Sequence, residues 1–148
     1  MQLKRQVEDY LLARCPITVA QGGLLQVSEP IFVEAIVDAL IFTSDLDKIP
    51  VVEQSAYEKL RKYLHPLRGG DEGRGWDFGK LPCLSDLFGL LEVIDGVDYV
   101  ARLAMTIRAY KDRSVLIERT LRADEAVDFE IPRYAVIFSG RHNITVTA

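Results

Sequence analysis

The residues best placed to do chemistry lie in one glycine-rich loop, residues 64–82. This loop holds five of the ten glycines in the chain and its only tryptophan, Trp76. Three carboxylates are in it as well, and such groups bind hard cations through oxygen. They are Asp71, Glu72 and Asp77. Because glycine gives backbone freedom at an entropic cost, we expect the aromatic side chains to pin this loop while the glycines let it bend.

Known site chemistries fit this loop poorly. The carboxylate spacing matches no EF-hand, and the neighbouring Arg68 and Arg74 would compete for those groups, so we expect solvated or internally paired charges. A P-loop needs Gly-Lys-Ser/Thr at the start of a helix, whereas Gly79-Lys80 precedes Leu-Pro. His142 stands apart from any Cys or carboxylate at metal-ligand spacing. We therefore expect no metal, no cofactor and no catalytic residues, and the chain is predicted not to be an enzyme.

Two interpretations of Trp76 in this loop remain open. In one, Trp76 folds back and fills a satellite core beneath the loop. In the other, Trp76 or Phe78 anchors a partner protein, because aromatic residues on presented loops are typical binding hot spots. A third hypothesis makes residues 68–80 an anion- or ligand-binding loop of a small regulatory module. The candidate interaction or structural residues are Arg68, Gly69, Gly70, Arg74, Gly75, Trp76 and Phe78.

Composition limits the class of protein. The chain has 148 residues, with 49% hydrophobic and 27% charged residues and a net charge of −4, which is typical of one soluble domain. No block of basic residues suggests nucleic-acid binding. No apolar run approaches the ~18 residues of a membrane span, and the N-terminus lacks a signal-peptide pattern. We expect a cytoplasmic chain with Cys15 and Cys83 as reduced thiols.

Hydrophobic periodicity predicts the elements. A helix carries the stripe Leu3, Val7, Tyr10 and Leu11 and ends at Pro16. A strand covers residues 30–43. A second helix opens at Pro50 and stops at Pro66. Residues 77–81 are a short strand, and Ser85 caps a third helix that ends at Asp95-Gly96.

A second long strand is expected over residues 97–109, with Val97, Tyr99, Ala101 and Leu103 on one face. Its Arg102 or Arg108 would face Glu34 or Asp38 on the first strand. Residues 110–130 read as a strand or short helix and then a polar excursion. The last two β-rich runs, residues 134–139 and 143–147, flank Gly140-Arg141-His142 and are predicted to form a hairpin.

This order indicates an α+β fold in which two helices pack on one face of a small mixed sheet, with an N-terminal helix and a C-terminal β-hairpin. We expect a single domain over residues 1–148. Its parts are the N-terminal helix and lead-in (1–29), a strand-helix-loop-helix-strand core (30–109) and a β-rich tail (110–148).

Several short motifs follow one another in an order typical of one protein family. They begin with Val7-x-x-Tyr10-Leu11-x-x-Arg14-Cys15-Pro16, Leu64-x-Pro66, Gly69-Gly70 and Gly73-Arg74-Gly75-Trp76-Asp77-Phe78-Gly79. They continue with Ser85-Asp86-Leu87, Leu90-Leu91-Glu92, Gly96-Val97-Asp98-Tyr99-Val100 and Phe138-Ser139-Gly140-x-His142-x-Ile144-x-Val146. The ordered set resembles the C-terminal part of putative baseplate assembly proteins, the baseplate protein J-like family of contractile tails and contractile injection systems.

The resemblance implies a structural role in a wedge that joins the tail hub to the sheath. It implies other baseplate proteins as partners (wedge, hub or sheath-connecting subunits) and assembly as a homo- or hetero-oligomer. The protein would be cytoplasmic during assembly and then part of a phage tail or injection-system particle. Family members are much longer, with further N-terminal domains, and no catalytic residues are carried over.

Overall fold

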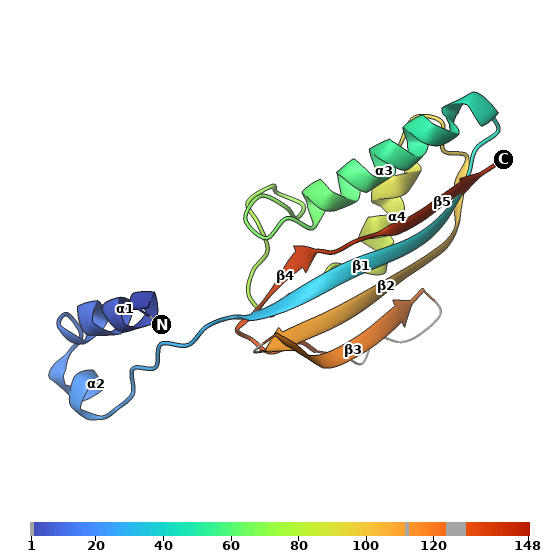
Figure 1. The fold of residues 1–148 in the computed structure, drawn as a ribbon. Coiled ribbons are helices and arrows are strands. Elements are labelled where there is room, and N and C mark those ends of the chain that lie inside the picture. The colour runs from blue at the N-terminus through green and yellow to red at the C-terminus, as the bar shows by residue number, and fades with distance from the viewer. Residues whose placement is uncertain (1, 112, 124–129) are drawn as a thin grey trace. The chain divides into compact units, whose positions relative to one another are not determined.

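The chain forms two compact units, residues 1–30 and residues 31–148. The structure, a computed structural model, describes residues 2–111, 113–123 and 130–148. The first unit contains α1 (Gln2–Leu12), α2 (Ile17–Gln21) and an extended segment before β1. The second unit contains a five-stranded sheet and the helices α3 and α4 (Figure 1).

The N-terminal helix that the sequence predicts is present as α1. Its apolar stripe is solvent-accessible, with Leu3 73% and Tyr10 57% exposed, and no α1 residue is buried. The helix ends at Leu12, and Pro16 is the residue before α2. Within this unit α1 therefore has no core to cover its amphipathic face.

The second unit is an α+β fold built on a mixed sheet, as predicted. The strands lie in the order β3–β2–β1–β4, and β5 lies beside β1 further along the same edge. β1–β2 and β2–β3 are antiparallel, whereas β4 and β5 run parallel to β1. The elements of this unit are β1 (Ile31–Phe42), the 3-10 helix η1 (Leu46–Lys48), α3 (Ile49–Tyr63), α4 (Leu84–Glu92), β2 (Tyr99–Lys111), β3 (Ser114–Arg122), β4 (Ala135–Ser139) and β5 (Asn143–Thr147).

Strand β1 is central and confirms the strand predicted over residues 30–43. Its alternate residues from Val33 to Ile41 are at most 1% exposed. They face α3 and α4, which cover the same side of the sheet (Figure 1). α3 buries Val52, Ala56 and Leu60 and contacts β5, whereas α4 contacts β2. The predicted layer of two helices on one face is confirmed.

Two local predictions beside these helices are wrong. Cys83, not Ser85, is the N-cap of α4, and no side chain caps that end. Residues 77–81 form no strand, because Phe78 and Gly79 lie in a turn. Gly96 does take a positive φ of 93°, but in the turn that follows α4 rather than at its last residue.

The face predicted for the second long strand is wrong at the start of the strand, before Leu103, because of a β-bulge. Ile41 pairs with Val100 and Leu40 pairs with Arg102, which leaves Ala101 without a partner residue. An extra residue reverses the alternation of side chains. Val100 and Leu103 are therefore buried, whereas Tyr99 is 51% exposed.

The predicted cross-strand pairs are partly present. Arg102 Nη2 lies 3.4 Å from Asp38 Oδ1, as predicted. Arg108 lies opposite Glu34 in register, but its Nε binds Glu118 Oε2 of β3 at 2.5 Å. Glu34 instead accepts a 2.7 Å hydrogen bond from the Tyr110 hydroxyl. The two exposed ion pairs help to set the register and contribute little stability.

The region from 110 to 130 contains the strand β3, one of the two possibilities that the sequence left open. β3 pairs along β2 from Ala104 to Lys111. The polar excursion was expected from Glu118, but the chain stays in β3 as far as Arg122, and residues 124–129 lie outside the described residues.

The predicted C-terminal hairpin is wrong, although both of its strands exist. β4 pairs in parallel with residues 31–35 of β1, and β5 pairs in parallel with residues 38–42. The two strands thus continue each other along one edge of β1, and the chain does not reverse at Gly140-Arg141-His142. The glycine that suggested a turn marks a bulge instead.

Candidate functional site

The glycine-rich loop is closed by hydrogen bonds within itself and to the last residue of α3. The backbone N–H groups of Gly69 and Gly70 donate to the carbonyls of His65 and Tyr63, each at 2.8 Å. Gly75 N–H donates to Gly69 O at 2.9 Å, and Trp76 N–H donates to the Pro66 carbonyl at 3.0 Å. An anion cradle needs free N–H groups that point at the ligand, and these four already have partners.

Gly75 shows why this loop needs glycine. Its φ is +94°, and a Cβ at this position would lie 2.5 Å from the Pro66 carbonyl oxygen. A side chain would therefore meet both backbone strain and a backbone clash. The glycines here serve a tight, closed turn rather than a flexible linker.

Trp76 folds back onto the end of α3. Its ring meets Tyr63 edge-to-face, with 5.4 Å between ring centroids and an angle of 89°. Its Nε1–H donates to the Tyr63 carbonyl at 2.9 Å, and the side chain packs against the hydrophobic core. The Tyr63 hydroxyl in turn donates to Asp71 Oδ1 at 3.0 Å. Burial raises the pKa of Tyr63 well above its usual value, and the bond to Asp71 adds to that rise.

The carboxylates of the loop are partnered, as expected from the nearby cations. Glu72 pairs with Arg74, and Asp77 Oδ2 lies 2.9 Å from Lys80 Nζ. The Lys80 ammonium lowers the pKa of Asp77. Within residues 2–111, 113–123 and 130–148, no group of three or more His, Cys, Asp or Glu side chains is placed to hold a metal ion.

The loop thus divides the seven candidate residues into two sets. Gly69, Gly70, Gly75 and Trp76 form the closed turn against α3. Arg68, Arg74 and Phe78 face solvent, and Phe78 is 63% exposed.

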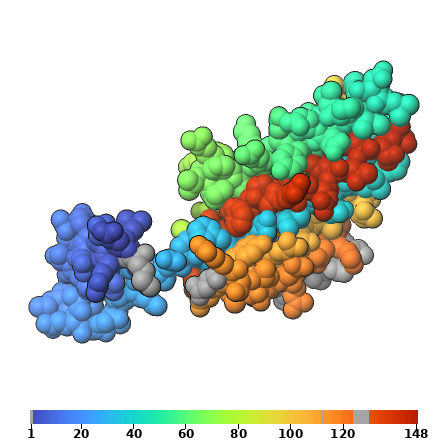
Figure 2. Space-filling view, viewed as in Figure 1, coloured from blue at the N-terminus to red at the C-terminus, as the bar shows by residue number. Residues whose placement is uncertain are grey.

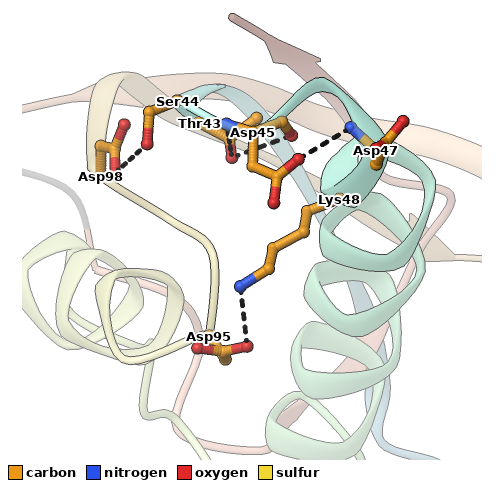
Figure 3. A network of polar contacts seen from close by, with 7 residues as sticks. All are labelled: Thr43, Ser44, Asp45, Asp47, Lys48, Asp95 and Asp98. Carbon is orange, nitrogen blue, oxygen red and sulfur yellow. Dashed lines mark hydrogen bonds and ion pairs between the residues drawn. The ribbon is translucent and has the colours of Figure 1, made fainter.

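A second polar cluster joins the turns at the other end of α3 (Figure 3). Lys48 Nζ lies 3.3 Å from Asp95 Oδ2, and Ser44 Oγ donates to Asp98 Oδ1 at 3.3 Å. Asp45 Oδ1 accepts from the Asp47 N–H at 3.1 Å and caps η1. These carboxylates tie the segment after β1 to the segment before β2, which is a structural role.

Sequence reasoning missed a Ser–His contact at the bulge between β4 and β5. Ser139 Oγ lies 2.9 Å from His142 Nε2, and His142 is 7% exposed. The ring also packs edge-to-face on Tyr57 of α3 at 5.7 Å. The sequence does carry a signal of the bulge. The apolar residues that face the helices have odd numbers before it (Ala135 and Ile137) and even numbers after it (Ile144 and Val146), so one extra residue must lie between them.

The other nitrogen of His142 decides what this contact can do. The backbone N–H of Val37 donates to His142 Nδ1 at 3.0 Å, so Nδ1 carries no proton. In the neutral ring the proton then lies on Nε2, which donates to Ser139 Oγ. A ring nitrogen that donates to the hydroxyl cannot remove its proton, so the pair lacks the arrangement of an activated nucleophile.

Burial lowers the pKa of His142 to about 4, and the nearby Glu34 opposes this only in part. A protonated ring would turn an N–H toward the Val37 N–H. His142 therefore serves as a neutral hydrogen-bond acceptor in the sheet.

No family model matches the chain, and a search of the curated proteins finds no match either. None of the described helices is both long and apolar enough to cross a membrane.

We predict graded losses of stability at Trp76. Trp76→Phe keeps most of the packing but loses one hydrogen bond, and we expect a cost of about 1 kcal/mol. The Tyr63 carbonyl keeps its bond from Gly70 in this variant. Trp76→Ala also loses the ring contact, and we expect about 2–3 kcal/mol. Urea unfolding followed by circular dichroism measures both, with Phe78→Ala as the exposed control. Equal stability of the wild type and Trp76→Ala would contradict the packing described here.

We predict that His142 makes the fold sensitive to mild acid. Its folded pKa of about 4 lies below the ~6.5 of an unfolded histidine, so the unfolded chain binds the proton first. The free energy of unfolding therefore has its full value above pH ~6.5. It falls by up to ~3 kcal/mol as the pH decreases toward 4.

The matched control is His142→Asn, whose amide oxygen replaces Nδ1 as the acceptor and does not titrate. Urea unfolding from pH 8 to 4 gives the unfolding free energy of the wild type and of this variant. Their difference isolates the contribution of His142 to the pH dependence, because the carboxylates titrate in both proteins. A difference that stays constant across this range would refute the assignment.

Proposed function

We propose that this chain is a structural component of a baseplate wedge in a contractile tail or contractile injection system. It acts through protein–protein assembly and is not an enzyme. It is made in the cytoplasm and then built into the particle, next to other wedge, hub or sheath-connecting subunits. The proposal starts from the ordered motifs that resemble baseplate protein J-like proteins.

The observation that best supports an assembly role is the way the glycine-rich loop is built. The N–H groups of Gly69, Gly70, Gly75 and Trp76 and the loop's three carboxylates already bond within the loop or to Tyr63 of α3, which leaves them unavailable to a small ligand. These bonds hold the closed turn that carries Leu67 next to Arg68 in the chain, and the bond from Gly79 N–H to Ala135 O at 2.8 Å holds the turn at Phe78; Leu67 and Phe78 are 77% and 63% exposed. Rigid, exposed apolar groups next to a cation are typical of a protein contact.

Two further features favour assembly. α1 leaves its apolar stripe uncovered within its own unit. The sheet face opposite the helices also carries exposed aromatic side chains, among them Phe32 and Tyr99, each 51% exposed. Apolar surface of this kind is normally buried by partners.

The rival hypothesis, an anion-binding regulatory module, has less support because four loop N–H groups already have acceptors. Trp76 is the reporter that separates the two hypotheses. Saturable changes in its fluorescence on titration with inorganic phosphate or nucleotides would favour the rival.

The assembly role predicts that Phe78→Asp blocks particle formation without unfolding the chain. The charge would be placed in a buried contact, where it is strongly unfavourable. The test introduces the variant in the source cells and counts sheathed particles by electron microscopy. Its control is Val51→Asp, because Val51 lies in the first turn of α3 and has the same 63% exposure.

We expect both variants to keep the wild-type melting temperature within about 2 °C and only Phe78→Asp to reduce the particle count. Normal particles with Phe78→Asp would rule out this loop as the contact. Absence of the protein from purified sheathed particles would rule out the wedge role itself.

A further inference from the structure

A groove of about 600 Å³ runs between α3 and β5. The α3 wall is one helical face, formed by Pro50, Glu53, Gln54 and Tyr57, and the other wall is residues 141–145. A second hollow of about 520 Å³ shares Tyr57 and Arg141 and extends to Arg61 and Gly140. Figure 2 shows the C-terminal strands, in red, at the surface directly beside α3.

The strand wall of the groove is a free sheet edge. Thr147 O accepts from the Thr43 N–H at 2.9 Å, so Thr147 is one of the β5 residues that bond to β1. In a parallel ladder alternate residues bond to one neighbour, and Ile144 and Val146 therefore turn their N–H and C=O groups away from β1. β5 pairs with no second strand among the described residues. An edge of this kind is a template for one more strand.

The charged residues that line the groove determine which side-chain charge an added strand should carry. Arg61 and Arg141 line the hollow at the β4 end and make no ion pair with a described residue. Two carboxylates also line these hollows: Glu34, which accepts the hydrogen bond from Tyr110, lies with the two arginines, and Glu53 lies on the α3 wall toward Pro50. Arginine binds carboxylates through paired N–H donors, so this end of the groove favours an acidic side chain.

We propose that the groove between α3 and β5 binds an extended acidic segment of a partner protein, which adds to the free edge of β5 as a further strand. Main-chain bonds to Ile144 and Val146 supply affinity, and Arg61 with Arg141 supplies the preference for acidic segments. A second copy of β5 fits less well, because residues 143–147 contain no carboxylate side chain to meet the two arginines. The proposal does not depend on the baseplate role.

The test is an NMR titration of the full chain with two capped peptides of about eight residues. One alternates valine with glutamate and the other alternates valine with lysine. We expect the glutamate peptide to cause saturable shifts at the amides of Ile144 and Val146, and to bind at least about tenfold more tightly than the lysine peptide. The double variant Arg61→Glu/Arg141→Glu should reverse this preference.

Val146→Pro tests the strand addition itself. It removes an N–H that points away from β1, so the β1–β5 ladder is kept, and binding of the glutamate peptide should be lost. Val146→Ala is the control for lost packing and should retain binding. The control for folding is an unchanged amide spectrum outside residues 140–148.

Three results would overturn the proposal. They are no saturable shift with the glutamate peptide at millimolar concentration, equal binding of the two peptides, and unchanged binding by Val146→Pro. Dimerisation of the free chain through this edge, seen by sedimentation and abolished by Val146→Pro, would assign the edge to a second copy instead.

Discussion

Strand β1 has to satisfy its backbone hydrogen bonds along both edges at once, and most of the second unit follows from this constraint. β2 pairs along one edge over nearly the whole strand. The other edge is shared by β4 and β5, which leave a break opposite Val37. A buried N–H without an acceptor is costly, and the imidazole of His142 supplies the acceptor. A side chain therefore replaces one backbone bond in the centre of the sheet.

The two ends of α3 are held by different means. At its start, polar side chains of the turns around η1 reach the segment before β2 (Figure 3). At its end, Trp76 and Gly70 both donate to the Tyr63 carbonyl, which is one of the carbonyls that a helix leaves without an internal partner. Gly79 then donates its N–H to Ala135 O of β4 at 2.8 Å. The glycine-rich loop thus joins the helix layer to the sheet edge that contains the bulge.

The sequence predicted what depends on local periodicity. The strand at residues 30–43, the helix from Pro50 and the two helices on one face follow from apolar spacing alone. The partners of β4 and β5 did not follow, because a short glycine-containing segment between two β-rich runs is typical of a hairpin. The pairing with β1 depends on contacts across the whole second unit. Only the shift of the apolar positions from odd-numbered Ile137 to even-numbered Ile144 indicated that residues 134–139 and 143–147 could line the same face of one sheet.

The candidate site shows the same division. The glycines and Trp76 mark the loop in the sequence, and the expected internal pairing of its charges is present. Neither the acceptor role of His142 nor the free edge of β5 could be predicted, since both depend on the bulge. Ala101 is a comparable case, where one unpaired residue in β2 reverses the faces that alternation predicts.

The bond between Val37 and His142 joins residues that are 105 positions apart in the chain. Contacts of such long range are reached slowly, because the entropy of closing the loop is lost before any pairing compensates for it. The β1–β2 antiparallel pair and its helices can form first, while the other edge of β1 still has unpaired N–H and C=O groups that can bind another chain. That order of events makes the docking of the last two strands the step at which folding competes with aggregation.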